Sequence, residues 1–393
     1  MPHLVLALLL ASAPAPAEDS PAPGCPPERA PDGETRLVFL GDSGYGEGSS
    51  GWGGQGQEAI AARIEGLRLA PDLVFFLGDN VYWGGSSELF KSRFDDMYAP
   101  VIRECKAHAA LGNHDVKGCR TLEGPDLPGD ATAYEDARPG VKTCNAAAAL
   151  SHEPFGFGGV ASRRERYYSV SWPTPRPLVD VIVLDSNTLR VDGGLVQERE
   201  GRPREDRSQL RWLRTAMAQS SGEPRAWKVV AVHHPPATPR GCACRFFGWC
   251  LGRHQDQVGL RSQLDAALEG LEPPDIVLAG HNHVYARSHA LGRSGELARS
   301  GERGVRYFVT GGGGAPLYHV DGNDERFAKA LTTHHFVYLR LTASSAFFWV
   351  MDGSGRIRDS GCFDKGSNVD HPLQRGLLYD APLPPRCAPP HAE

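Results

Sequence analysis

The chain has no excess of positive charge and no apolar run long enough to cross a bilayer. Its 42 Lys and Arg residues are outnumbered by 47 Asp and Glu, and the net charge is -5. A basic surface for nucleic acid or for an anionic membrane is therefore not expected. The N-terminal apolar run, 1–13, falls short of the roughly 20 residues that a membrane span needs. No internal repeat of fixed period is present, so a repeat architecture is not indicated.

The N-terminal run is instead typical of a cleaved export signal. Small residues follow it and Ala15-Pro16-Ala17 offers a cleavage site, although no Lys or Arg precedes it. We expect 1–17 to be a signal peptide and 18–34, rich in Pro, Glu and Asp, to be a linker. No cysteine stands where a lipid would be attached, so the sequence predicts a soluble secreted or periplasmic protein. It indicates no particular oligomeric state.

Nine cysteines support an oxidising compartment, because so many thiols are unusual in a cytosolic enzyme. The odd number leaves at least one cysteine unpaired within the chain. Cys242, Cys244 and Cys250 lie close together, which favours a disulfide-stapled loop. A zinc site is the alternative and would need a fourth ligand such as His254. Cys25 and the last cysteine, at position 387, flank the body of the chain and are candidates to tie its ends together.

Short apolar runs alternate with helical patterns over most of the chain, which is typical of a layered α/β fold. Buried strands are expected at 36–40, 73–77, 107–111, 167–170, 179–184, 227–232 and 275–279, and antiparallel strands at 306–309, 335–341 and 346–351. Helices are expected at 57–69, 88–98, 207–218 and 257–268. The segment 116–165 lacks periodicity and is expected to be an inserted surface segment. The end of the chain, 353–393, is expected to be a Pro-rich tail without core residues beyond Cys362.

Five of these strands end directly in residues of the types that bind metals. In chain order they are Asp42, Asp79 with Tyr82, Asn113 with His114, His233, and His281 with His283. In layered α/β folds, ligands bind just beyond the carboxyl ends of the strands, so we expect these side chains to meet. Five such ends, all carrying Asp, Asn, His or Tyr, predict a metal site rather than coincidence.

Two further polar residues stand at strand ends. Asp185 lies outside the five blocks and is expected to be a structural hydrogen-bond acceptor. His234, directly after His233, is either a weaker candidate for chemistry or a side chain that points into the neighbouring layer.

The five blocks resemble those of the metallophosphoesterase (calcineurin-like) superfamily and, within it, the purple acid phosphatases. They are Gly41-Asp42-Ser43-Gly44, Gly78-Asp79-Asn80-Val81-Tyr82, Gly112-Asn113-His114-Asp115, Val230-Ala231-Val232-His233 and Gly280-His281-Asn282-His283. The resemblance is closest to the small tartrate-resistant type. It implies a catalytic domain at 35–352 that folds as a four-layer αββα sandwich, with two mixed β-sheets flanked by helices. A dinuclear metal site would lie at the carboxyl ends of the strands.

The resemblance also implies a ligand set. A ferric ion would be held by Asp42, Tyr82 and His283, and a divalent ion (Fe, Zn or Mn) by Asn113, His233 and His281, with Asp79 as the bridge. Hard carboxylate and phenolate oxygens suit Fe(III), while imidazole and a neutral amide suit a divalent ion. His114 is implied as the residue that protonates the leaving group or steadies the phosphate. The implied reaction is hydrolysis of a small-molecule or protein phosphomonoester by in-line attack of a metal-activated hydroxide.

Three other functions are weighed against this one. A phosphodiesterase or nucleotidase of the same superfamily, with two Mn or Zn ions, usually lacks a tyrosine at the position of Tyr82. A surface-binding protein that had kept the fold but lost activity would have lost a ligand, and all seven are present. A redox or zinc-storage protein would place its function on the cysteine cluster around Cys244.

Overall fold

The structure is a computed structural model, and it describes residues 33–46, 55–82, 90–103, 106–116, 119–121, 134–136, 166–189, 191, 207–219, 226–246, 249–320, 323–373 and 376–387. The expected signal peptide, nearly all of the expected linker and most of the segment 116–165 lie outside these residues. Within the described ranges, no helix combines the length and the apolar character that a membrane span requires.

The first large sheet has six strands in the order β18-β17-β16-β1-β2-β3. Their bounds are Thr35–Leu40 (β1), Leu73–Leu77 (β2), Ala107–Ala110 (β3), Phe336–Leu341 (β16), Ser345–Met351 (β17) and Ile357–Asp364 (β18). β1, β2 and β3 run parallel, and β16 to β18 continue the sheet in antiparallel order. All residues of β1 and β2 are buried, as their continuous apolar sequences predict for strands covered on both faces.

The second large sheet has seven strands in the order β15-β12-β13-β11-β8-β7-β6. Their bounds are Tyr168–Trp172 (β6), Val179–Val183 (β7), Trp227–Val232 (β8), Ile276–Ala279 (β11), Tyr285–Ser288 (β12), Arg306–Thr310 (β13) and Phe327–Leu331 (β15). The four central strands, β7, β8, β11 and β13, run parallel. Their carboxyl ends therefore open on one edge of the sheet.

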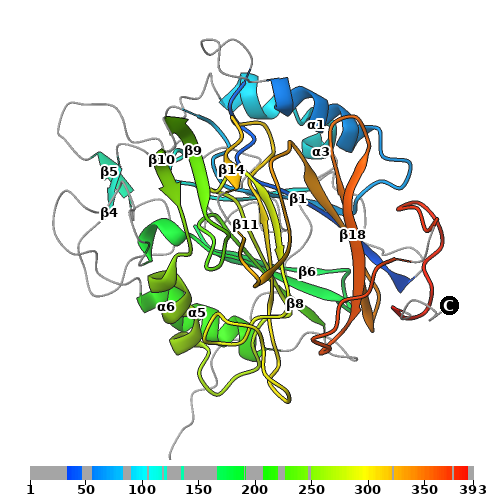
Figure 1. The fold of residues 1–393 in the computed structure, drawn as a ribbon. Coiled ribbons are helices and arrows are strands. Elements are labelled where there is room, and N and C mark those ends of the chain that lie inside the picture. Colours follow the sequence, from blue (N-terminus) through cyan, green and yellow to red (C-terminus); the bar gives the residue numbers. More distant parts are fainter. Residues whose placement is uncertain are drawn as a thin grey trace, which may run out of the picture.

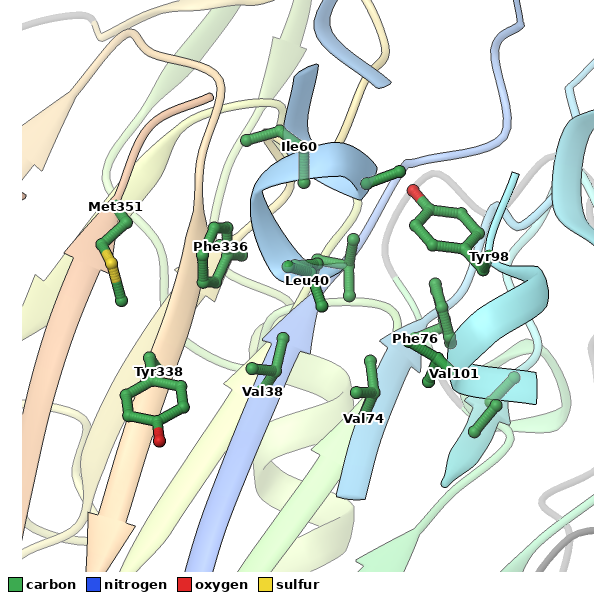
Figure 2. Packing of buried hydrophobic residues seen from close by; sticks show 14 of the residues in the cluster. Val38, Leu40, Ile60, Val74, Phe76, Tyr98, Val101, Phe336, Tyr338 and Met351 are labelled. Atoms are coloured by element: carbon green, nitrogen blue, oxygen red, sulfur yellow. The ribbon is translucent and has the colours of Figure 1, made fainter. Parts of the chain in front are cut away.

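The two sheets pack face to face and helices cover their outer faces. Alternate residues of β1 point in opposite directions, so Phe39 joins the core between the sheets while Val38 packs under Ile60 of α1 (Gln55–Glu65) (Figure 2). The helices on one side are α1 and α3 (Ala99–Arg103), and those on the other are α5 (Arg207–Ala218) and α6 (Val258–Ala267) (Figure 1). The predicted αββα sandwich is confirmed.

The helix expected at 88–98 differs from the prediction. In the described part of this segment the structure has a π-helix, η2 (Lys91–Asp95), followed by α3. The turn is wider than an α-turn because the N–H of Asp96 donates to the carbonyl of Lys91, 2.9 Å away. Phe94 and Tyr98 then both pack edge-on against Phe76, at ring distances of 4.6 and 4.7 Å. Aromatic packing on the sheet, rather than helical periodicity, decides this segment.

The cysteine-rich segment forms a hairpin that the sequence did not predict. β9 (Gly241–Phe246) pairs with β10 (Trp249–His254) and with β14 (His319–Val320) in a small three-stranded sheet. A disulfide joins Cys242 to Cys250 across this hairpin, which confirms the favoured staple. A second small sheet, β4 (Cys119–Thr121) with β5 (Tyr134–Asp136), is the described part of the expected insertion.

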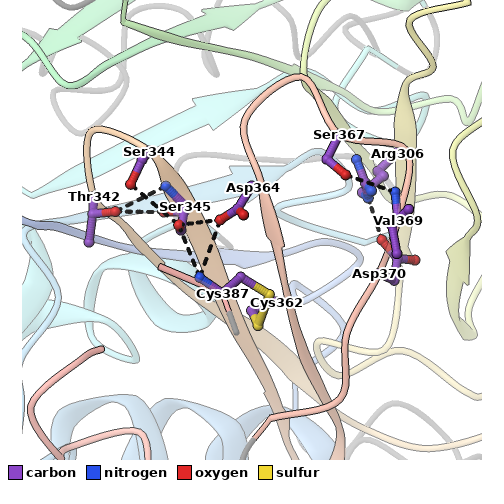
Figure 3. Close-up of a disulfide and its surroundings, with 10 residues drawn as sticks. All are labelled: Arg306, Thr342, Ser344, Ser345, Cys362, Asp364, Ser367, Val369, Asp370 and Cys387. Atoms are coloured by element: carbon purple, nitrogen blue, oxygen red, sulfur yellow. Dashed lines mark hydrogen bonds and ion pairs between the residues drawn. A yellow bond between two sulfur atoms is a disulfide. The ribbon is translucent and has the colours of Figure 1, made fainter. Parts of the chain in front are cut away.

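The expectation of a tail without core residues is wrong. β18 adds a strand to the first sheet, and Tyr379 and Cys387 are buried in the core beneath α1. The guanidinium of Arg340 donates to the carbonyls of Tyr379 and Ala381 at 2.8 and 2.6 Å. Cys387 forms a disulfide with Cys362, not with Cys25, which lies outside the described residues (Figure 3). A proline-rich segment is thus held by a disulfide and by buried arginines, since Arg306 also pairs with Asp370 near its start.

Removing this second disulfide should destabilise the fold without touching the site. The bond closes a loop of 25 residues, for which loop-closure entropy gives about 3 kcal/mol of stabilisation. We expect the double variant Cys362→Ala/Cys387→Ala to lose about that free energy of unfolding in urea denaturation. The variant no longer has this bond, so reductant cannot lower its stability by breaking it. An unchanged unfolding midpoint under oxidising conditions would show that the tail is held by its other contacts alone.

Candidate metal centre

The site residues predicted from five strand ends meet where the parallel strands of both sheets finish. Asp42 and Asp79 follow β1 and β2 in the first sheet, and His233 follows β8 in the second. One ligand atom from each of these three side chains can be chosen so that all lie within 4.8 Å of one another. All three are buried. The two sheets therefore bring together residues almost 200 positions apart.

A first group of donors forms around the carboxylate of Asp42. Its Oδ1 accepts a hydrogen bond from the Tyr82 hydroxyl at 3.0 Å and lies 3.2 Å from Nε2 of His283. The Tyr82 oxygen is in turn 2.9 Å from the same nitrogen. A carboxylate, a phenol and an imidazole thus converge from β1, β2 and the loop that follows β11.

A second group of donors forms around the amide of Asn113. Its Oδ1 lies 3.0 Å from Nε2 of His233 and 3.0 Å from Nδ1 of His281. Oδ1 of Asp79 is 3.5 Å from Nε2 of His233, so this carboxylate faces the second group. It also lies close to the carboxylate of Asp42, so it stands between the two groups. His114 lies at the rim, where its Nε2 is 4.0 Å from Oδ2 of Asp79 and 18% of its side chain is exposed.

Backbone carbonyls fix the orientation of two of the imidazoles. Nδ1 of His233 is 2.8 Å from the carbonyl of Leu77, and Nδ1 of His283 is 2.7 Å from the carbonyl of Pro316. A carbonyl only accepts hydrogen bonds, so Nδ1 must carry the proton in both rings. Nε2 then presents its lone pair to the centre, which is the form that binds a metal.

The backbone is strained at three of the converging residues. Asp42, Asp79 and His281 have φ values of 57°, 52° and 67°, in the left-handed region that side chains avoid. Such conformations cost about 1–3 kcal/mol each, persist only where the surrounding structure enforces them, and cluster at functional sites. Each strained residue follows a glycine, and at Gly78 a Cβ would lie 2.5 Å from Nδ1 of His233. The Gly-Asp and Gly-His pairs thus allow the turns that aim these side chains at one another.

Burial and charge set the protonation of the donors. Burial, with the nearby Asp42 and Asp79 carboxylates, raises the pKa of Tyr82 well above its usual value. Burial and the neighbouring imidazoles of His234 and His233 hold the pKa of His281 well below 6.5, so that ring is neutral. Burial opposes ionisation of Asp79, but the facing imidazoles of His233 and His114 lower its pKa overall. Carboxylates, imidazoles, a phenol and an amide oxygen form a donor set that fits a pair of metal ions.

Asp115 is a positioning residue that sequence reasoning did not single out. It is fully buried and its carboxylate accepts the backbone N–H groups of Gly112, Asn80 and Val81 at 2.8, 2.9 and 3.2 Å. These bonds tie the loop after β2 to the loop after β3. Its place in the block Gly112-Asn113-His114-Asp115 was the signal that could have found it.

Tyr318 and His254 also escaped the sequence analysis as neighbours of the centre. The Tyr318 ring stacks on His283 with 4.1 Å between ring centres. His254, considered only as a zinc ligand beside the cysteines, lies instead 4.7 Å from the rings of both Tyr318 and His281. Neither residue stands at the carboxyl end of a strand in the two large sheets, so the strand-end pattern in the sequence did not mark them.

Asp185 is structural, as expected. Its carboxylate pairs with the fully buried guanidinium of Arg166 at 2.8 Å. It also accepts the backbone N–H of Asn187 at 3.0 Å and so begins the short helix η5 (Ser186–Thr188) after β7. The glycines at 311–314 return toward the centre, where the N–H of Ala315 donates to the carbonyl of Asp42 at 2.9 Å. The glycine-rich loop at 44–56 lies mostly outside the described residues.

Comparison with known proteins identifies the family of this fold and site. The family model described as Metallophos, calcineurin-like phosphoesterase, matches residues 35–285. The chain belongs to the calcineurin-like phosphoesterase family. The match covers all five blocks completely, so it confirms the resemblance found from the motifs.

A curated relative of this calcineurin-like phosphoesterase is the tartrate-resistant acid phosphatase type 5 of Sus scrofa, 24% identical over 241 residues. The alignment covers 58% of this chain and 56% of the relative, so the chain spans little more than half of that protein's length.

Three solved structures share the fold. Purple acid phosphatase PPD1 of yellow lupin (Lupinus luteus) matches with a TM-score of 0.56 and 18% identity over 84% of this chain and 54% of that one. PhoD matches with 0.57 and 14% identity over 92% and 74%. GAP50, described as the anchor in the inner membrane complex of Plasmodium, matches with 0.54 and 12% identity over 84% and 89%. At these identities the likeness concerns the fold alone.

Proposed function

We propose that this calcineurin-like phosphoesterase is a metal-dependent acid phosphatase that hydrolyses phosphomonoesters at acidic to neutral pH. The ferric ion would be held by Asp42, Tyr82 and His283, the divalent ion by Asn113, His233 and His281, and Asp79 would bridge the two. One observation carries the proposal: two groups of donor atoms converge on either side of Asp79, and each contains a backbone-oriented imidazole.

The charges of the side chains suit a phosphate dianion. Two carboxylates and one phenolate would offset about three of the roughly five positive charges of a ferric and a divalent ion. The centre would keep a net positive charge. When bound, the metal pair would hold the ester and lower the pKa of the attacking water. The chain's own part is to keep these donors in place, which Asp115 and the glycine turns do.

His114 is proposed to donate the proton that the leaving alkoxide needs. Its backbone N–H donates to Oδ1 of Asp79 at 2.8 Å, which fixes the residue beside the bridge. Its ring lies 4.5 Å from the ring of Tyr82, and its side chain is partly open to solvent. An imidazole that touches both the centre and the solvent can pass a proton to a departing group.

Removal of metal should abolish turnover of p-nitrophenyl phosphate. After dialysis against a strong chelator we expect the rate to fall by at least about a thousandfold, because the attack depends on several kcal/mol of metal-supplied stabilisation. Reconstitution with Fe(III) plus Zn²⁺, Mn²⁺ or Fe²⁺ should restore it. The measurement is initial rate against the metal content of the same sample.

A diester supplies the control for substrate class. Bis(p-nitrophenyl) phosphate should be turned over more slowly than the monoester by the same reconstituted protein. Full monoesterase activity in a sample that contains no metal would contradict the proposal. A preference for the diester would instead favour a phosphodiesterase of the same superfamily.

We also propose that the protein acts outside the cytosol, as a secreted or periplasmic enzyme. The apolar N-terminal run and its Ala15-Pro16-Ala17 site support this, and so do the disulfides Cys242–Cys250 and Cys362–Cys387. The N-terminal run lies outside the described residues, so its support comes from sequence alone.

A further inference from the structure

His234 is a buried imidazole that the proposed function leaves without a role. It directly follows His233 and is 2% exposed. The centre of its ring lies 4.4 Å from that of His281 and 4.9 Å from that of His233. One nitrogen from each of the three rings can be chosen so that all three lie within 4.8 Å of one another. His234 therefore faces the second donor group.

A rigid partner holds the other side of this ring. Oγ of Ser186 lies 2.8 Å from Nδ1 of His234 and accepts the backbone N–H of the same histidine at 3.2 Å. Ser186 opens η5, which is fixed by the buried ion pair between Asp185 and Arg166. Metal-binding histidines typically have such a fixed polar partner on the ring nitrogen that does not face the metal. The surroundings of His234 thus match those of a ligand.

We propose that His234 is a third imidazole ligand of the divalent ion, beside His233 and His281. Since Nδ1 faces Ser186, Nε2 is the nitrogen left to bind. The inference rests on the proposed metal centre and adds a ligand to it. The divalent ion would then have three imidazoles, the amide oxygen of Asn113 and the shared carboxylate of Asp79 as donors.

This donor set selects a class of cation. Imidazole suits Zn²⁺ and Fe²⁺, whereas Mn²⁺ prefers carboxylate and other oxygen donors. A third imidazole should therefore widen the preference for Zn²⁺ over Mn²⁺. A variant without it should hold both ions more weakly and distinguish them less.

The test uses the full-length, metal-loaded protein and competition with a chromophoric chelator for Zn²⁺ and, separately, for Mn²⁺. His234→Asn is the informative variant, because the Asn amide can take the place of Nδ1 beside Ser186 while Nε2 is lost. We expect its Zn²⁺ affinity to fall at least about tenfold and its Mn²⁺ affinity to fall less. His254→Asn is the matched control. The His254 ring also lies 4.7 Å from that of His281, but among the described residues His254 is not in the group of three.

Each outcome has a defined meaning. A selective loss in His234→Asn, with His254→Asn unchanged, supports the inference. Equal Zn²⁺ affinity in the wild type and His234→Asn, or an equal loss in both variants, overturns it while leaving the proposed function in place. A wild-type protein that binds no metal overturns the proposed function itself. X-ray absorption at the zinc edge of the wild type needs no variant: three imidazoles support the inference, and two overturn it.

Discussion

Replacing Asp79 by Asn should lower the turnover of p-nitrophenyl phosphate by at least about a thousandfold. The side chain lies between the two donor groups, 3.5 Å from Nε2 of His233 and close to the carboxylate of Asp42. An amide keeps the shape but removes the negative charge that the two cations would share. A thousandfold loss corresponds to about 4 kcal/mol of transition-state stabilisation. The measurement is kcat together with the metal content of the purified variant.

A second buried aspartate provides the matched control. Asp180 stands near the amino end of β7, whereas the centre lies at the carboxyl ends of the strands. Its carboxylate pairs with the ammonium of Lys228 at 2.7 Å. Asp180→Asn makes the same chemical change and leaves a buried cation unpaired, so it should cost stability. The folded fraction should keep its turnover within about threefold. Equal losses of turnover in both variants would mean that any buried aspartate matters, and Asp79 would lose its special role.

Replacing Tyr82 by Phe should remove the visible absorption of the iron-loaded protein. The band is expected to come from charge transfer between a tyrosinate and Fe(III), and the phenol oxygen of Tyr82 lies 3.0 Å from Asp42 and 2.9 Å from His283. Burial raises the pKa of this phenol well above its usual value. Only a bound cation of high charge would therefore ionise it at acidic pH. We also expect iron to be held about 10- to 100-fold more weakly.

Tyr318 is the control for this spectrum. It stacks on His283 with 4.1 Å between ring centres, yet it belongs to neither donor group. Tyr318→Phe should therefore keep the band. If the band survived in Tyr82→Phe and vanished in Tyr318→Phe, the ligand assignment would pass to the other tyrosine. A colourless, iron-free and fully active wild type would contradict the ferric ion itself.

The convergence of the site could be predicted because its residues follow a local rule. The parallel strands that lead to the site are short apolar runs. A Gly-Asp, Gly-Asn or Gly-His pair soon after β1, β2, β3 and β11 signals a turn that exposes a polar side chain, and His233 follows β8 directly. Since parallel strands share one carboxyl edge, the order of the blocks was enough to place Asp79 near His233. The left-handed φ of Asp79 is the local cost of this arrangement.

The parts that escaped prediction depend on contacts between distant segments. Tyr318 reaches the centre through the pairing of β14 with β9, which no local pattern specifies. The end of the chain looks like a polar tail because it is rich in proline, and only the disulfide to Cys362 and the bonds from Arg340 show why Tyr379 is buried. Composition describes the average character of a segment, whereas burial depends on which single side chains find a partner.

The donors of each proposed ion come from both sheets. Asp42 and Asn113 end strands of the six-stranded sheet, while His283 and His281 follow β11 of the seven-stranded one. Neither half of the sandwich holds the complete donor set of either proposed ion, so full loading has to follow the docking of one half on the other during folding. Once bound, the ions would act as cross-links between the halves. A chelator should then loosen the apolar interface between the sheets, far from any atom that it removes.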